Sequence, residues 1–156
     1  MRIQDIRCYL IEEPDPLGSF RWRKGVPAHT GDPIRMAYVR VDTDEGVTGC
    51  VQTERGDAVV SLVRRRLKAL IGEDPLMTER LWGLIWEIDR IEEMQLSHLG
   101  ALDLIAWDIK SRTARLPIYR LLGGHCNRVP AYASTVTWDT MGEYEQHIKE
   151  CIDVGF

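Results

Sequence analysis

The residues best suited to chemistry in this sequence are basic and aromatic ones that alternate in one short run, Arg21-Trp22-Arg23-Lys24. A guanidinium group binds a carboxylate through two parallel hydrogen bonds, so Arg21 and Arg23 suit carboxylates and hydroxyl-rich acids. An indole such as that of Trp22 can exclude water where a loop closes over a ligand. Two other interpretations stand beside this one. The same alternation suits single-stranded nucleic acid, and an exposed basic loop needs no ligand at all.

The other residues that could do chemistry are scattered. His98 opens a predicted helix, His125 follows a Gly-Gly pair and His147 lies beside acidic residues, so each is more typical of a surface or satisfied histidine than of a metal ligand. The acidic residues 42–45 form a turn whose composition needs no ion. We find no nucleophile-base pair and no phosphate-binding glycine loop.

Composition narrows the functional classes. The 156 residues are 44% hydrophobic and 28% charged, which is typical of an ordinary globular protein. A net charge of −4 argues against broad binding of nucleic acid or acidic membranes, and residues 1–13 contain no long apolar stretch for a signal peptide or membrane span. The cysteines lack a Cys-x-x-Cys pair and indicate reduced thiols in a cytoplasmic protein, although their even number also permits disulfides; they are Cys8, Cys50, Cys126 and Cys151.

The first third of the chain predicts an antiparallel meander. Residues 3–11, 34–41 and 47–52 have strand patterns, and residues 42–46 supply a tight turn in which Gly46 takes a positive φ. Between the first two strands, residues 13–33 are interrupted repeatedly by proline and glycine. We expect this segment to lack regular structure and to form a mobile loop near solvent.

The pattern then changes to helices. Asp57 is a candidate N-cap for a helix that ends at Gly72, and Asp74 with Pro75 supplies the N-cap and first residue of the next. A third helix is expected near residues 96–114. Its predicted buried stripe consists of Leu99, Leu102, Ala106 and Ile109. Pro117 opens a shorter helix that Gly123-Gly124 closes.

The last residues predict a different architecture. Residues 129–136 are strand-like, residues 140–154 are helical, and Gly155-Phe156 leads toward another strand. This is the first βα unit of a repeating fold, whereas a (β/α)8 barrel takes about 250 residues. We therefore expect one domain over residues 1–127 and the start of a truncated barrel over residues 128–156.

One run of motifs carries a family resemblance. Ala101-Leu102-Asp103 and Trp107-Asp108-Ile109-Lys110 are followed by a proline-started helix and a Gly-Gly pair, all downstream of the Asp44-Glu45-Gly46 hairpin. This order resembles the N-terminal capping domain of the enolase superfamily, in its mandelate racemase and muconate lactonizing branch. One departure is Gly49-Cys50-Val51-Gln52, where the family often shows a Gly-x-Gly-Glu-like segment.

The resemblance implies an α+β fold, with a three-stranded antiparallel meander, a helical bundle and the start of a (β/α) barrel. It implies that loops at residues 13–33 and 53–57 close over the barrel mouth and select the substrate. The substrate-binding candidates in these loops are Trp22, Arg23, His29, Glu54 and Arg55. We expect no catalytic and no metal-binding residue in this segment, which should be inactive alone.

The chemistry implied by the family is abstraction of a proton α to a carboxylate. Mg²⁺, held by carboxylates on later barrel strands, stabilises the enediolate, and Lys or His is the base. The basic loop favours dehydration of a sugar acid, whereas Trp22 and Trp138 could equally pack an apolar substrate. Racemization and cycloisomerization stay open, as does a non-catalytic α+β binding or assembly module. The expected partners are a small carboxylate substrate, in particular a sugar acid, and further copies of the chain in a homo-oligomer.

Overall fold

A computed structural model of the chain describes residues 1–14, 19–21, 27–30, 32–93 and 96–156. It divides into two compact units. The first comprises residues 1–12 and 35–124, and the second comprises residues 13–34 and 125–156. None of the helices in the described part is long and apolar enough to cross a membrane.

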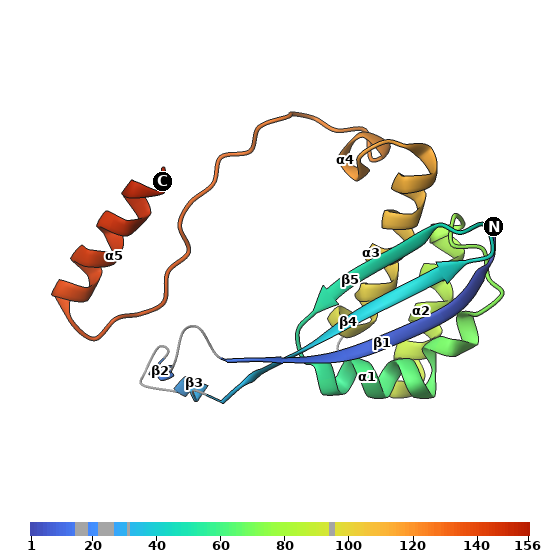
Figure 1. Cartoon of the computed structure of the whole chain (residues 1–156), viewed down its shortest axis with the longest axis horizontal. Coiled ribbons are helices and arrows are strands. Elements are labelled where there is room, and N and C mark those ends of the chain that lie inside the picture. Colours follow the sequence, from blue (N-terminus) through green and yellow to red (C-terminus); the bar gives the residue numbers. More distant parts are fainter. Residues whose placement is uncertain (15–18, 22–26, 31, 94–95) are drawn as a thin grey trace. The chain divides into compact units, whose positions relative to one another are not determined.

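A three-stranded sheet forms one side of the first unit. It contains β1 (Ile3–Glu13), β4 (Ile34–Thr43) and β5 (Thr48–Thr53) in the order β1-β4-β5. Neighbouring strands run in opposite directions, as Figure 1 shows. Gly46 takes a φ of 78° in the tight turn between β4 and β5. The predicted antiparallel meander is therefore confirmed.

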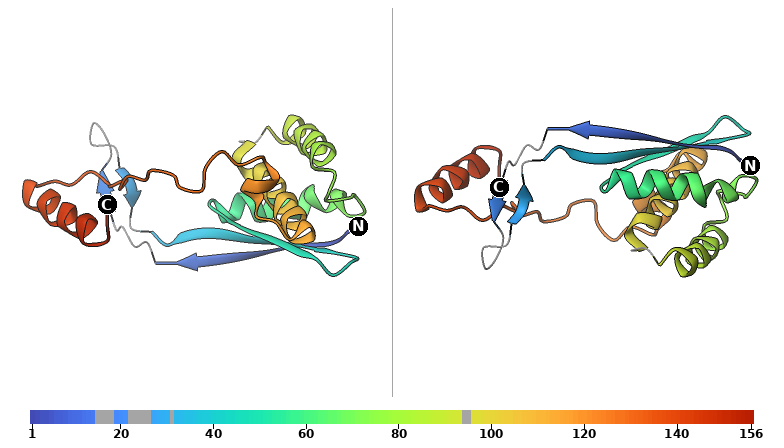
Figure 2. Two further views of the ribbon diagram at one scale, coloured as in Figure 1. Left: turned by 90° about the horizontal axis from the view of Figure 1, so that it is seen from above. Right: turned by 90° about the horizontal axis from the view of Figure 1, so that it is seen from below.

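Helices cover one face of this sheet (Figure 2). They are α1 (Gly56–Arg65), the 3-10 helix η2 (Leu67–Leu70), α2 (Thr78–Glu92) and α3 (Leu96–Ala114). The short helix α4 (Ile118–Leu121) packs against α3. The core lies between the two layers. The predicted stripe of α3 is buried, with exposed fractions from 0% at Leu99 and Ile109 to 5% at Leu102. On β4, Ala37, Val39 and Val41 point into the same core.

Two predicted helix caps are wrong. Arg55, not Asp57, occupies the N-cap of α1, and the Asp57 carboxylate forms an ion pair with Arg35 instead. Asp74 accepts a hydrogen bond from the backbone N–H of Leu76 (3.0 Å), which closes a local turn, and α2 begins only at Thr78. Aspartate serves such turns and helix caps through the same side-chain acceptor, so local sequence does not separate the two.

The predicted first helix is also divided. A single helix to Gly72 was expected, but α1 ends at Arg65 and continues as the tighter η2. Val59 and Leu62 are fully buried in α1, whereas Val60, which the expected apolar spacing includes, is only partly buried.

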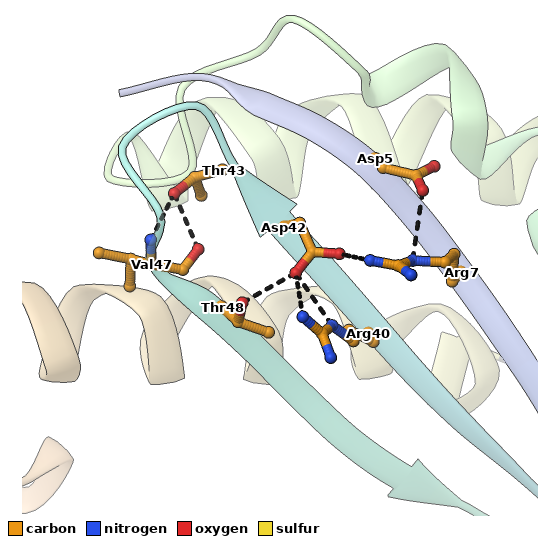
Figure 3. Close-up of polar contacts among 7 residues, drawn as sticks. All are labelled: Asp5, Arg7, Arg40, Asp42, Thr43, Val47 and Thr48. Atoms are coloured by element: carbon orange, nitrogen blue, oxygen red, sulfur yellow. Dashed lines mark hydrogen bonds and ion pairs between the residues drawn. The ribbon is translucent and has the colours of Figure 1, made fainter.

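The outer face of the sheet carries a cluster of paired charges, drawn in Figure 3. Arg40 and Thr48 both donate to one oxygen of Asp42, at 2.8–2.9 Å, and Arg7 binds the other oxygen. Hydrogen bonding from Arg40, followed by that from Arg7 and Thr48, holds the pKa of Asp42 well below its usual range. These charges satisfy one another and fasten β1 to β4 and β5.

The second unit corrects the expectation of an irregular loop. Within residues 13–33, β2 (Ser19–Arg21) pairs antiparallel with β3 (Pro27–Thr30), with a register shift between Phe20 and Arg21. Pro27 is compatible with this small sheet because it is the first residue of its strand, where a missing N–H is tolerated. The proline and glycine spacing therefore does not exclude a strand ladder.

The rest of the second unit contains α5 (Met141–Asp153). Thr140 and Glu143 form a reciprocal capping box at its start, so the predicted helix is confirmed. His147 stacks on Trp138 at 3.9 Å between ring centroids and places Nδ1 2.8 Å from Glu150 Oε2.

Residues 129–136, predicted as a strand, join no ladder with any strand that the structure describes. Strand geometry depends on a paired neighbour, and barrel strands take theirs from other βα units.

Candidate functional site

The topology of the sheet brings the stems of both predicted loops to one end. β1 and β5 run in the same direction on either side of β4, as Figure 1 shows. The end of β1, the start of β4 and the end of β5 therefore lie at the same end of the sheet. This end of the first unit is the candidate functional site.

Arg35 fastens these stems together. Its Nε lies 2.9 Å from Oε2 of Glu12 at the end of β1, and its Nη1 lies 3.3 Å from Oδ2 of Asp57 in the first turn of α1. The hydrogen bonds that Arg35 donates to Glu12 and then to Asp57 raise the pKa of its guanidinium. Since all three side chains are largely exposed, the contribution to stability is small, and the main consequence is geometric.

The shorter of the two predicted loops, residues 53–57, connects β5 to α1. Its residues Glu54 and Arg55 are both exposed. Arg55 has φ 55° and ψ 50°, a left-handed conformation that is uncommon for a residue with a β-carbon. Its carbonyl accepts the backbone N–H of Ala58 at 3.0 Å, so the backbone caps the helix and its side chain makes no cap hydrogen bond. Such strain is typical of positions where function sets the backbone.

A histidine completes a small pocket at this loop. Thr53, Glu54 and Arg55 line a pocket of about 200 Å³ together with His98, the third residue of α3. Both ring nitrogens of His98 are buried and have no hydrogen-bond partner among the described residues. The expectation of a surface or satisfied histidine is therefore wrong. A signal was available, because His98 lies one helical turn before the buried Leu102 and so falls on the inward stripe of α3.

The predicted substrate-binding residues have different outcomes. The structure brings Glu54 and Arg55 together in the pocket. Trp22 and Arg23 lie outside the described residues, and for His29 the described part is the backbone, within β3. Their role in substrate binding stays a prediction.

The pocket offers binding groups and no metal site. A guanidinium, a carboxylate, an imidazole and a hydroxyl converge there, a set that can hydrogen-bond a polar, negatively charged ligand. In the described part of the chain, no three His, Cys, Asp or Glu side chains gather closely enough to hold a metal ion. These residues do not fit Mg²⁺. All four cysteines are unpaired thiols.

Comparison with known proteins gives a consistent result. Residues 22–123 match the model of the mandelate racemase / muconate lactonizing enzyme N-terminal domain. The chain is 31% identical over 130 residues to a D-galactonate dehydratase from Pectobacterium atrosepticum, an alignment that covers 80% of this chain and 34% of that protein. It therefore spans about a third of the length of the curated relatives that it matches.

Solved structures extend the similarity to nearly the whole chain. A racemase from Streptomyces coelicolor A3(2) with bound magnesium superposes with a TM-score of 0.84 at 25% identity, over 99% of this chain and 44% of that one. A dipeptide epimerase from Enterococcus faecalis V583 superposes with a TM-score of 0.82 at 22% identity, over 100% of this chain and 44% of that one, which is a likeness of fold.

Proposed function

Because this chain belongs to the mandelate racemase and muconate lactonizing enzyme family and contains its N-terminal domain, we propose that it caps the active site of an acid-sugar dehydratase. The complete enzyme would remove the proton α to the substrate carboxylate and expel a hydroxyl group from the neighbouring carbon. The resulting enol would tautomerise to a 2-keto-3-deoxy acid. The segment would shape the substrate pocket, and the reacting groups would lie outside it.

The pocket formed by Glu54, Arg55 and His98 is the observation that carries this proposal. It is polar and lies at the end of β5, and Arg35 ties the first turn of α1, directly after the pocket in the chain, to the end of β1. A guanidinium suits a carboxylate, while a carboxylate and an imidazole suit hydroxyl groups. D-Galactonate dehydratase relatives support the same substrate class.

The metal site and the oligomeric state that we propose are properties of the complete protein. The magnesium-bound racemase relative supports a metal-dependent enzyme. We propose that residues outside this chain bind Mg²⁺, since the described residues do not form a suitable cluster. We also propose a cytoplasmic homo-oligomer in which residues 1–127 form the cap and residues 128–156 begin the barrel.

The direct test is a substrate screen with the full-length protein. Purified enzyme with Mg²⁺ would be incubated with a panel of sugar acids, and 2-keto-3-deoxy acids would be detected as semicarbazones. Dehydration of at least one sugar acid is expected. Exchange of an α-proton with solvent deuterium without loss of water would instead favour a racemase, the activity named for the Streptomyces coelicolor relative. Neither reaction on any carboxylate would favour a binding module.

Two single arginine variants, compared in the same assay, test whether the pocket binds the substrate. Arg55→Ala should lower kcat/KM by about 10- to 100-fold, the equivalent of a lost hydrogen bond to a charged group. Arg80→Ala is the matched control, because Arg80 is an exposed arginine that forms its ion pair with Glu73 and does not line the pocket. Equal kcat/KM values for the two variants would show that Arg55 does not bind the substrate.

A further inference from the structure

His98 has an unusual hydrogen-bond deficit for a residue in this position. An imidazole carries two ring nitrogens, and in the neutral form one donates and the other accepts a hydrogen bond. Here both nitrogens are shielded from solvent, and no described residue bonds to either of them. A buried polar group without a partner is costly, so such groups are rare and require an explanation.

Packing alone does not explain the histidine. The neighbouring stripe of α3 is filled by aliphatic residues such as Leu102 and Ile105, which fit the same core without polar atoms. A leucine at position 98 would avoid the deficit. The residue is only partly buried and lines the pocket beside Glu54 and Arg55. A turn of the imidazole about its Cβ–Cγ bond, a torsion with broad minima, would present a shielded nitrogen to a ligand there.

We infer that His98 is a specificity-determining residue that hydrogen-bonds a hydroxyl group of the bound substrate. The inference rests on the proposed function and assigns this pocket the hydroxyl-bearing part of a sugar acid. A hydroxyl group both donates and accepts, so it complements either tautomer of the ring. Glu54 can accept from a second hydroxyl group, and Arg55 supplies the positive charge.

The proposal makes binding depend on one hydroxyl group. A site that buries a polar group for its substrate discriminates strongly against an analogue that lacks the partner, because the protein group is then left unpaired. A pocket that merely tolerates a polar substrate shows no such dependence. The discriminating measurement therefore compares a sugar acid with its monodeoxy analogues.

The experiment uses the full-length enzyme with Mg²⁺ and the sugar acid that it dehydrates. His98→Leu should lower kcat/KM by about tenfold, as expected for one lost hydrogen bond. The loss should vanish for the one deoxy analogue that lacks the partner hydroxyl group and persist for the others. His98→Gln, which keeps donor and acceptor groups, should restore part of the activity.

Thermal melting of the ligand-free enzyme separates this role from a structural one. Since His98→Leu removes an unpaired buried polar group, its melting temperature should equal or exceed that of the wild type. His125→Leu is the control, an exposed histidine outside the pocket, and its kinetics should be unchanged.

The outcomes that overturn the inference are distinct from failure of the proposed function. Unchanged kinetics at His98→Leu would show that His98 does not bind the substrate. A lower melting temperature with equal losses on every analogue would show that its role is structural. Both outcomes leave sugar-acid dehydration intact. Turnover restricted to carboxylates without hydroxyl groups would overturn both.

Discussion

Gly49 of β5 lies so close to Ile109 of α3 that a β-carbon at position 49 would be 2.7 Å from Ile109 Cγ1 and 2.9 Å from the backbone oxygen of Ile105. The missing side chain at Gly49 therefore lets α3 pack closely against β5. Gly49→Ala should lower the free energy of unfolding by about 1–3 kcal/mol, because the side chain at position 109 and the helix backbone must both move. Urea denaturation measures the loss.

The control for this substitution is Gly83→Ala in α2, where an added β-carbon meets nothing within 4 Å. There the change should stabilise by about 0.5–1 kcal/mol through helix propensity. Equal effects at the two glycines would contradict the close approach of α3 to β5.

Leu102 tests the buried stripe of α3. Its side chain is 5% exposed within the core cluster, and Leu102→Ala should cost roughly 2–5 kcal/mol of the unfolding free energy, as expected for a cavity in a packed core. Leu104 lies on the outer face of the same helix and is 57% exposed. Leu104→Ala should change stability by no more than about 0.5 kcal/mol. Similar losses for the two leucines would mean that α3 packs in another orientation.

Asp42 predicts a pH dependence of stability. Because Arg40, Arg7 and Thr48 lower the pKa of its folded-state carboxyl, the unfolded chain takes up the proton first as the pH falls. The stabilisation is fully present above the ordinary pKa of about 3.9 and declines below it, toward the lower pKa of the folded state. Asp42→Asn should therefore lose about 1–2 kcal/mol at pH 7.

Urea denaturation at several pH values measures the unfolding free energy that Asp42→Asn loses. This loss should shrink as the pH is lowered below 4. Asp5→Asn serves as the control, since Asp5 pairs with Arg7 on the exposed side of the same cluster and should matter little. A loss that does not change with pH would refute the ion-pair explanation.

Much of this fold could be predicted because local sequence determines it. Gly46 allows the turn that aligns β4 with β5, and the spacing of Leu99, Leu102 and Ile109 identifies the buried face of α3. The site was less predictable. His98 was expected to be a surface or satisfied histidine, because whether a ring nitrogen finds a partner depends on residues from other elements. The Asp57 side chain binds Arg35, which lies on another strand, so its role was also decided by tertiary structure.

Arg35 provides a test of the link between the two loop stems. Arg35→Met should reduce kcat/KM of the full-length enzyme several-fold, because the end of β1 and the start of α1 lose their common tether. Stability should change by no more than about 0.5 kcal/mol, as is usual for exposed ion pairs. Arg80→Met removes a comparable exposed pair with Glu73 and should leave turnover unchanged. A large stability loss at Arg35→Met with normal kinetics would make the tether purely structural.

Arg55 allows its side chain and its backbone to be tested separately. Its φ of 55° is costly for any residue with a β-carbon and costs glycine little, so Arg55→Gly should be more stable than Arg55→Ala by about 1 kcal/mol. Both variants lack the guanidinium, and both should lose activity to a similar degree in the full-length enzyme. Thermal melts and kcat/KM for the pair distinguish the two effects. If Arg55→Gly retained wild-type kinetics, the strained backbone would serve the fold alone and the guanidinium would not bind substrate.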